Sequence, residues 1–132
     1  MNRLKILIIG DTHVSEYRSF PKQIQEYIEK HNWIIHVGDY TSESLIRVLR
    51  DKKGDKFVGV YGNSDPMSVR DLVKRKELIS IGGKIFGICH PWTGGSEGDA
   101  MRKVKKEFNL YNLDYLVFGH THDSLIRKEE NL

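Results

Sequence analysis

Five short apolar runs in this chain each end in a glycine or a turn, and each leads directly to a side chain that can bind a metal ion. The runs begin at Lys5, Trp33, Phe57, Ile85 and Tyr115. The donors that follow them are Asp11 and His13, Asp39, Asn63, His90, and lastly His120 and His122. Such runs are typical of buried strands, and open α/β sheets bind their ligands at the carboxyl ends of the strands. The sequence therefore predicts an α/β fold whose site lies at that edge.

The chain has 132 residues, which is long enough for a buried core, and we expect residues 1–132 to form a single domain. Its one cysteine, Cys89, excludes an internal disulfide and is typical of a reducing compartment. No apolar run approaches the roughly 20 residues that span a bilayer. The first run leads directly into Asp11 and is too short for a signal sequence. These features favour a cytoplasmic protein.

The balance of charge is mildly basic, with a formal net charge of +3. Basic residues cluster between Arg70 and Lys76 and again between Arg102 and Lys106. No aromatic residues alternate with these clusters, as they would in a surface that stacks single-stranded bases. We interpret both clusters as solvated faces and do not favour a nucleic-acid partner.

The first half of the chain predicts a β-α-β-α-β order. We expect strands at 5–9, Trp33–Val37 and Phe57–Tyr61. The first helix is expected to run from an N-cap at Ser19 to about Lys30. The second helix is expected to have its N-cap at Thr41 or Ser42 and to end before Gly54. This order predicts parallel strands joined by right-handed crossovers.

The second half predicts a different arrangement. A short helix is expected around Val69–Lys74, followed by a hairpin of Glu77–Ile81 and Lys84–Cys89 that turns at two glycines. A loop at 94–98, a helix at 99–108 and a strand at 114–118 complete the pattern.

The donors have the chemistry and the spacing of a metal centre. Asp11 and His13, like His120 and His122, are two residues apart, so an extended backbone directs both side chains of each pair the same way. Asp39 is suited to bridge two cations through its two oxygens. Taken singly, the donors are equally typical of caps and turns. Taken together, four of the six histidines follow predicted strands, and the pattern predicts a hydrolytic metalloenzyme. The other two, His31 and His36, we assign to packing or hydrogen bonding.

The order of these motifs resembles the calcineurin-like metallophosphoesterase superfamily, and more narrowly its small single-domain prokaryotic phosphodiesterases, which are related to a retromer subunit. The matching segments are Asp11-x-His13, Gly38-Asp39, Gly62-Asn63-Ser64-Asp65, His90 and Gly119-His120-x-His122. The resemblance implies a four-layer α-β-β-α sandwich of two mixed sheets, with a dinuclear centre at the C-terminal strand ends. It places Asp11, His13, Asp39 and His122 on one ion, and Asp39, Asn63, His90 and His120 on the other.

Two divalent ions per chain are therefore the expected cofactors. The mixed nitrogen and oxygen donors suit manganese, iron, nickel or zinc better than calcium, and the resemblance favours Mn²⁺. It further implies that a hydroxide bridging the two ions hydrolyses a phosphodiester or another small phosphorylated substrate directly. In that reaction Asp39, Asn63 and His90 are the expected catalytic residues, and Asn63 with Ser64 are expected to bind the substrate.

The chain departs from the family pattern in three places, one of which is Pro91 after His90, where glycine is usual. Ser64 stands where many members have a histidine that protonates the leaving group, and a hydroxyl cannot replace it near neutral pH. The chain also ends soon after His122, so the C-terminal strands of the family are expected to be shortened. An exposed sheet edge would favour a homodimer.

Two alternative functions stay open at this level. The first is a protein-interaction scaffold on a phosphoesterase fold, against which the full set of seven donors argues. The second is a nuclease, which the small size and the lack of an accessory DNA-binding segment make less favoured.

Overall fold

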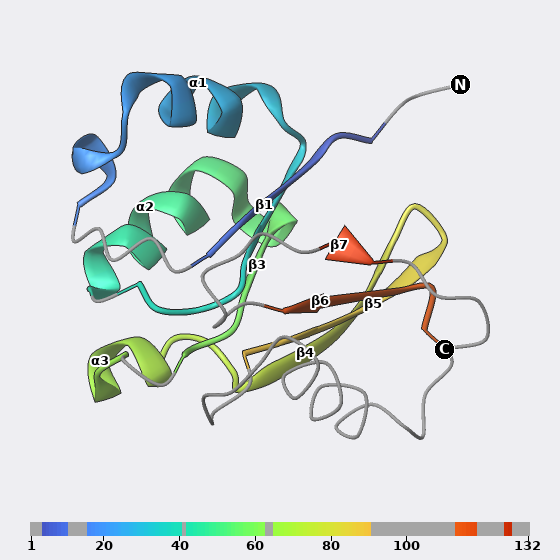
Figure 1. Ribbon diagram of the computed structural model, residues 1–132. Coiled ribbons are helices and arrows are strands. Elements are labelled where there is room, and N and C mark those ends of the chain that lie inside the picture. Colours follow the sequence, from blue (N-terminus) through green and yellow to red (C-terminus); the bar gives the residue numbers. More distant parts are fainter. Residues whose placement is uncertain are drawn as a thin grey trace.

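Two β-sheets with an apolar layer between them form the centre of the computed structural model (Figure 1). Residues 4–10, 16–40, 42–62, 65–90 and 113–118 are described, together with the backbone of 126–127. The first sheet has the order β1 (Ile6–Ile9), β2 (Trp33–His36) and β3 (Phe57–Gly59). The second sheet has the order β4 (Lys76–Ile81), β5 (Lys84–Cys89), β6 (Tyr115–Phe118) and β7 (Ile126–Arg127). The predicted α/β fold with two packed sheets is confirmed.

The described strands of the first sheet run parallel, as the predicted β-α-β-α-β order requires. Ile6 pairs with Trp33, and Ile34 pairs with Phe57. The two crossovers contain the helices α1 (Lys22–Lys30) and α2 (Glu43–Lys53), and a 3-10 turn, η2 (Gly54–Lys56), leads into β3. Because parallel strands end at the same edge of a sheet, this topology brings the segments after β1, β2 and β3 together.

Helix α2 begins and ends at residues that the sequence identified. Of the two predicted caps, Ser42 occupies the N-cap position, and its hydroxyl oxygen accepts a hydrogen bond from the Ser44 N–H at 3.2 Å. The helix ends at Gly54, whose φ of 58° is readily adopted only without a side chain. The face between these ends is buried through Leu45, Ile46 and Leu49.

The prediction of a helix N-cap at Ser19 was wrong. A 3-10 turn, η1, covers Tyr17–Ser19, and α1 starts only after Pro21. Phe20 is extended, with a φ of −65° and a ψ of 146°, because the ring of a following proline disfavours helical backbone at the preceding residue. Its side chain is buried in the core, so packing favours the same extended conformation.

The hairpin was predicted correctly, whereas the short helix before it lies earlier than expected. Strands β4 and β5 are antiparallel, and Gly82 and Gly83 both have positive φ, as the tight turn between them requires. The short helix, α3 (Met67–Arg70), begins directly after Pro66. It ends before Lys74 because that residue forms a parallel bridge with Val60, which returns the chain to the edge beside β3.

The two outer layers differ in how far they are described. Helices α1 and α2 lie together against the first sheet (Figure 1). The helix predicted at 99–108 and the loop predicted at 94–98 lie outside the described residues. Within the described ranges, no helix is long and apolar enough to cross a membrane.

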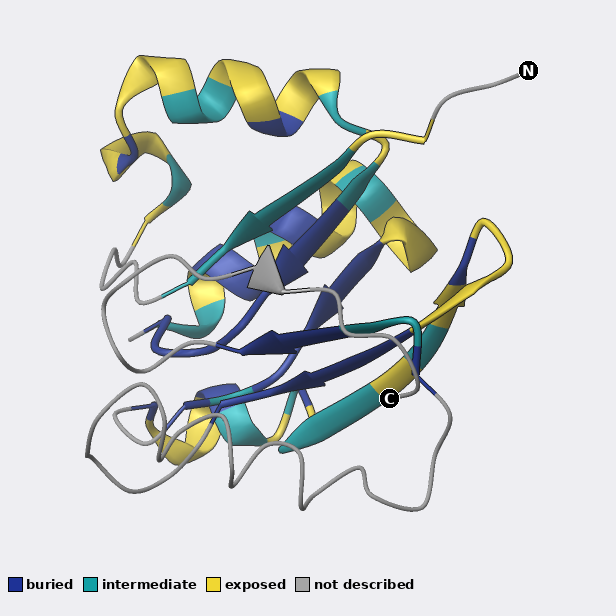
Figure 2. Cartoon of the chain, turned by 45° about the vertical axis from the view of Figure 1, so that its right-hand side comes forward, coloured by how far each residue is buried: buried dark blue, intermediate teal, exposed yellow. Residues whose placement is uncertain are grey.

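Two apolar clusters stabilise these layers, and the strands β2, β3, β5 and β6 are mostly buried (Figure 2). One cluster lies between the first sheet and its helices and includes Ile34 and Leu49. The other lies between the sheets and joins Ile35 of β2 to Ile88 of β5 and Val117 of β6. Alternate residues of β2 thus face different layers, and the strand is buried on both sides.

The cluster between the sheets generates a stability prediction. We expect Ile35→Ala to lower the free energy of unfolding by about 2–5 kcal/mol, because it leaves a cavity at a fully buried position. The control Met67→Ala removes a side chain that is 66% exposed, and should change that free energy by less than about 0.5 kcal/mol. Urea unfolding of both variants checks this, and equal effects would contradict the layered core.

Candidate metal centre

The structure brings together two of the predicted metal ligands. Oδ2 of Asp39, which follows β2, lies 3.5 Å from Nε2 of His90, which follows β5. Both side chains are buried. The other predicted site residues lie outside the described residues: Asp11, His13, Asn63, Ser64, His120 and His122. Among the side chains that are described, no three of His, Cys, Asp or Glu gather closely enough to hold an ion.

A sharp turn after β2 orients Asp39. Gly38 has a φ of 110° and Asp39 a φ of 62°, so two consecutive residues have positive φ. For a residue with a side chain, left-handed backbone costs about 1–2 kcal/mol. Other contacts must offset that cost, and strain of this kind is typical of functional sites.

A hydrogen bond to the backbone fixes the imidazole of His90. Its Nδ1 lies 2.8 Å from the carbonyl oxygen of Val37. Because a carbonyl oxygen only accepts, Nδ1 must carry the proton, and the neutral ring then has a lone pair on Nε2. That lone pair is on the nitrogen nearest to Asp39, and a backbone carbonyl on the opposite nitrogen is the usual support of a histidine metal ligand.

Two glycines allow the turns from both sheets to approach so closely. A Cβ added to Gly38 would lie 2.8 Å from Nδ1 of His90 and 2.8 Å from the Gly62 nitrogen. A Cβ added to Gly62 would lie 2.2 Å from Oδ1 of Asp39. The carboxylate of Asp39 therefore fills the space that the missing side chain of Gly62 leaves. Asn63, the next predicted ligand, directly follows that glycine.

A further buried carboxylate, Asp65, hydrogen-bonds to the backbone of both turns. Its Oδ2 accepts from the N–H groups of Asp39 at 2.7 Å and Gly62 at 2.8 Å, and its Oδ1 accepts from the N–H of Tyr40 at 2.6 Å. The sequence did not predict a role for this residue beyond its place in the matching segment. An acidic residue three positions after a strand-end glycine was the available signal.

Tyr40 and His36 pack against the back of the turn. Their rings stack with centroids 3.8 Å apart, and Nδ1 of His36 accepts a hydrogen bond from the Gly38 N–H at 3.1 Å. Burial raises the pKa of the Tyr40 hydroxyl well above its ordinary value, and the negative charge of Asp65 adds to that effect. Tyr40 is therefore a neutral packing group, and the packing role predicted for His36 is confirmed.

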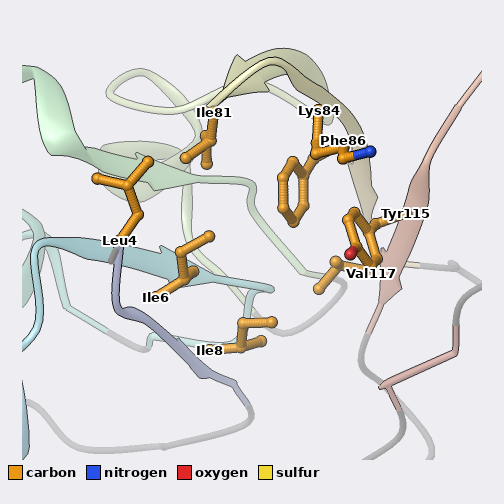
Figure 3. Close-up of a pocket in the computed structure, with 9 residues that line it drawn as sticks. Leu4, Ile6, Ile8, Ile81, Lys84, Phe86, Tyr115 and Val117 are labelled. Atoms are coloured by element: carbon orange, nitrogen blue, oxygen red, sulfur yellow. The ribbon is translucent and has the colours of Figure 1, made fainter. Parts of the chain in front are cut away.

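An apolar pocket between the sheets lies away from these residues and has no comparable chemistry. Its volume is about 320 Å³, and Ile6 and Ile8 face Phe86 and Tyr115 across it (Figure 3). Lys84 is the one charged side chain among the described residues that line it. It lies toward the first residues of β5, whereas Asp39 and His90 follow the last residues of their strands. We therefore place the candidate site at the strand ends.

The geometry of Asp39 and His90 fits a shared metal ion. Two ligand atoms about 2.1 Å from a tetrahedral ion are about 3.4 Å apart, close to the distance between these two side chains. The oxygen and imidazole donors suit transition-metal ions better than calcium. With its second oxygen directed toward Gly62, Asp39 can bind a metal ion on one side and contact the next turn on the other.

Comparison with known proteins identifies relatives along almost the whole chain. A family model described as the calcineurin-like phosphoesterase superfamily domain matches residues 4–132. The probable metallophosphoesterase MJ0623 of Methanocaldococcus jannaschii is 32% identical over 123 residues, which cover 90% of this chain. The chain spans 59% of the length of that relative.

Solved structures share the fold. Protein TM1076 of Thermotoga maritima is 29% identical and superposes with a TM-score of 0.70, over 92% of this chain and 75% of that one. Vacuolar protein sorting 29 of Cryptosporidium parvum is 21% identical, with a TM-score of 0.69 over 97% of this chain and 70% of that one. This sorting protein is the retromer subunit to which the sequence resemblance points, and the predicted likeness of fold is confirmed.

The close approach of Gly62 and Asp39 generates a metal-binding prediction. We expect Gly62→Ala to displace the Asp39 carboxylate and to weaken Mn²⁺ binding by about 10- to 100-fold. The control Gly54→Ala places a side chain at a φ of 58° with open space around it, so it should lower stability without changing metal affinity. Isothermal titration calorimetry checks both variants, and similar affinities for Gly62→Ala and wild type would contradict the geometry.

Proposed function

Because the chain belongs to the calcineurin-like phosphoesterase superfamily, we propose that it is a dinuclear metal-dependent phosphodiesterase. The family implies divalent metal ions and hydrolysis of phosphoester bonds. This proposal adds three points to what the family implies: two ions per chain, a preference for Mn²⁺ and a preference for diesters.

The observation that supports it most directly is the pairing of Asp39 with His90. These side chains come from different sheets, are buried, and lie 3.5 Å apart with the lone pair of the imidazole on the nearer nitrogen. If Asp39 only capped the following turn, it would not need the imidazole nitrogen of His90 at this distance. The proposed centre places Asp11, His13 and His122 with Asp39 on one ion, and Asn63, His90 and His120 with Asp39 on the other.

Bound as a pair, divalent ions neutralise charge on phosphoryl oxygens and lower the pKa of coordinated water to about 7. The chain's own groups prepare the site for that chemistry. The Val37 carbonyl keeps the proton of His90 on Nδ1, and the turn at Gly38 holds Asp39 toward His90. Burial of both groups keeps bulk water from competing for them.

The expected substrate is a phosphodiester or another small phosphorylated compound. Asn63 and Ser64 are the proposed contacts to its phosphoryl oxygens. Without an imidazole at position 64, the leaving group must depart with little help from a protein acid, which favours diesters with good leaving groups.

A protein-interaction scaffold is the second candidate function. It is supported by the similarity of fold to vacuolar protein sorting 29. The two functions differ in what they require of Asp39, because a scaffold can replace this buried carboxylate without loss. Metal-dependent turnover therefore separates them.

The central experiment measures hydrolysis of bis(p-nitrophenyl) phosphate by metal-stripped protein, with and without added Mn²⁺. We expect activity only with the metal, and a loss of about 100-fold or more in Asp39→Asn. The control Asp55→Asn changes an exposed carboxylate and should retain wild-type activity. Two bound ions per chain without any turnover would instead favour the scaffold.

The serine at position 64 generates a prediction about leaving groups. Wild-type protein should hydrolyse the aryl diester much faster than an alkyl monoester. Ser64→His should raise the rate on the alkyl monoester by about tenfold or more, because it supplies a proton donor with a pKa near neutrality. Ser64→Ala is the control, because it supplies no proton donor. Separate assays on cyclic nucleotides and single-stranded DNA test the nuclease alternative. A wild-type preference for the alkyl monoester would contradict the prediction.

A further inference from the structure

The carboxylate of Asp65 connects two turns that carry proposed metal ligands. Its Oδ2 accepts hydrogen bonds both from the N–H of Asp39, after β2, and from the N–H of Gly62, after β3. Its Oδ1 accepts from the N–H of Tyr40. All three bonds are 2.6–2.8 Å long, which is typical of charge-assisted hydrogen bonds.

These bonds act on the conformation that orients Asp39. The positive φ of Asp39 turns its own N–H and that of Tyr40 toward the same carboxylate. If Asp65 lost its acceptor atoms, three buried N–H groups would lose these hydrogen bonds, and the strained turn would lose the contacts that favour it. The orientation of the Asp39 side chain toward His90 therefore depends on an anion that is not adjacent in the sequence.

Asp65 is itself held in place from both sides. Its N–H donates to the Gly62 carbonyl oxygen at 3.2 Å, which ties Asp65 to the turn after β3. Its own carbonyl oxygen accepts from Nε of Arg70 in α3 at 2.9 Å, and the Arg70 guanidinium lies over the Tyr61 ring. The carboxylate is 3% exposed.

We propose that Asp65 is a positioning residue of the metal centre. It does not act as a ligand, because both of its oxygens already accept backbone N–H groups. Instead it fixes the turn of Asp39 relative to the turn of Gly62, so that the Asp39 carboxylate keeps its orientation toward His90. This inference rests on the proposed function, and it extends the site to a residue beyond the seven proposed ligands.

Asp65→Asn tests the proposal with almost no change in volume. The amide has only one accepting oxygen, so at least one of the three N–H groups faces a donor in place of an acceptor. We expect Mn²⁺ affinity, measured by calorimetry, to fall about 10- to 100-fold. At saturating Mn²⁺ we expect kcat to fall while KM for the aryl diester changes less than twofold.

A readout on the metal-free protein separates positioning from general stability. In ¹⁵N–¹H spectra the amide protons of Asp39, Tyr40 and Gly62 should move upfield in Asp65→Asn, because they lose charged acceptors. The matched control is Asp114→Asn, since Oδ2 of Asp114 accepts from the Ile85 N–H at 2.8 Å, away from these turns. It should leave the three amide signals, the Mn²⁺ affinity and kcat unchanged.

The outcomes distinguish this inference from the proposed function. Wild-type binding and turnover that Asp65→Asn leaves unchanged would overturn the positioning role alone. Wild-type protein that binds no Mn²⁺ would refute the proposed function, and this inference with it. If Asp65→Asn does not fold, Arg70→Ala decides, because it releases the carbonyl of Asp65 at a partly exposed position. It should weaken Mn²⁺ binding severalfold, and an unchanged affinity would overturn the proposal.

Discussion

The hydrogen bond between Nδ1 of His90 and the carbonyl oxygen of Val37 joins the two sheets at the candidate metal centre. It connects the end of β5 to the end of β2, and it determines which imidazole nitrogen faces Asp39. The bond depends on Gly38, because a Cβ at that position would lie 2.8 Å from the same Nδ1. The arrangement of the proposed ligands therefore depends on backbone geometry that the sandwich imposes, in addition to the chemistry of the ligands themselves.

Most of the fold could be predicted because local patterns and tertiary packing agree. Strands β1, β2 and β3, helix α2 and the hairpin of β4 and β5 all follow the periodicity and turn residues of the sequence. The two errors, at the start of α1 and at the position of α3, occurred where local patterns and tertiary packing disagree. Ser19 has the chemistry of an N-cap, but Pro21 and the burial of Phe20 keep the preceding backbone extended. Helix α3 ends at Arg70, before the predicted end at Lys74, because the bridge between Val60 and Lys74 returns the chain to the sheet.

Two of the predicted donors, Asp39 and His90, lie together in the described part of the chain, whereas the groups that support them were not predictable from the sequence. Asp39 and His90 each follow an apolar run, and the packing of the two sheets brings the ends of these two strands together. Asp65 does not directly follow an apolar run, and its position three residues after Gly62 and before a proline is equally typical of an ordinary turn residue. Its function depends on accepting N–H groups 25 and 26 residues away, and a contact of that range has no periodicity in the sequence. The tautomer of His90 is likewise determined by a carbonyl 53 residues away.

The distribution of buried polar groups argues against a purely structural explanation of the candidate metal centre. In the described part of the chain four polar residues are buried: His36, Asp39, Asp65 and His90. Each belongs to, or hydrogen-bonds with, the turns at the strand ends. Burying such groups opposes folding, and well-packed apolar residues in their place often stabilise a protein. A chain that served only as a surface for a partner would have no need of Asp39 and His90 buried 3.5 Å apart. Their concentration at one edge, around a strained aspartate, therefore supports ligand chemistry as the reason for this arrangement.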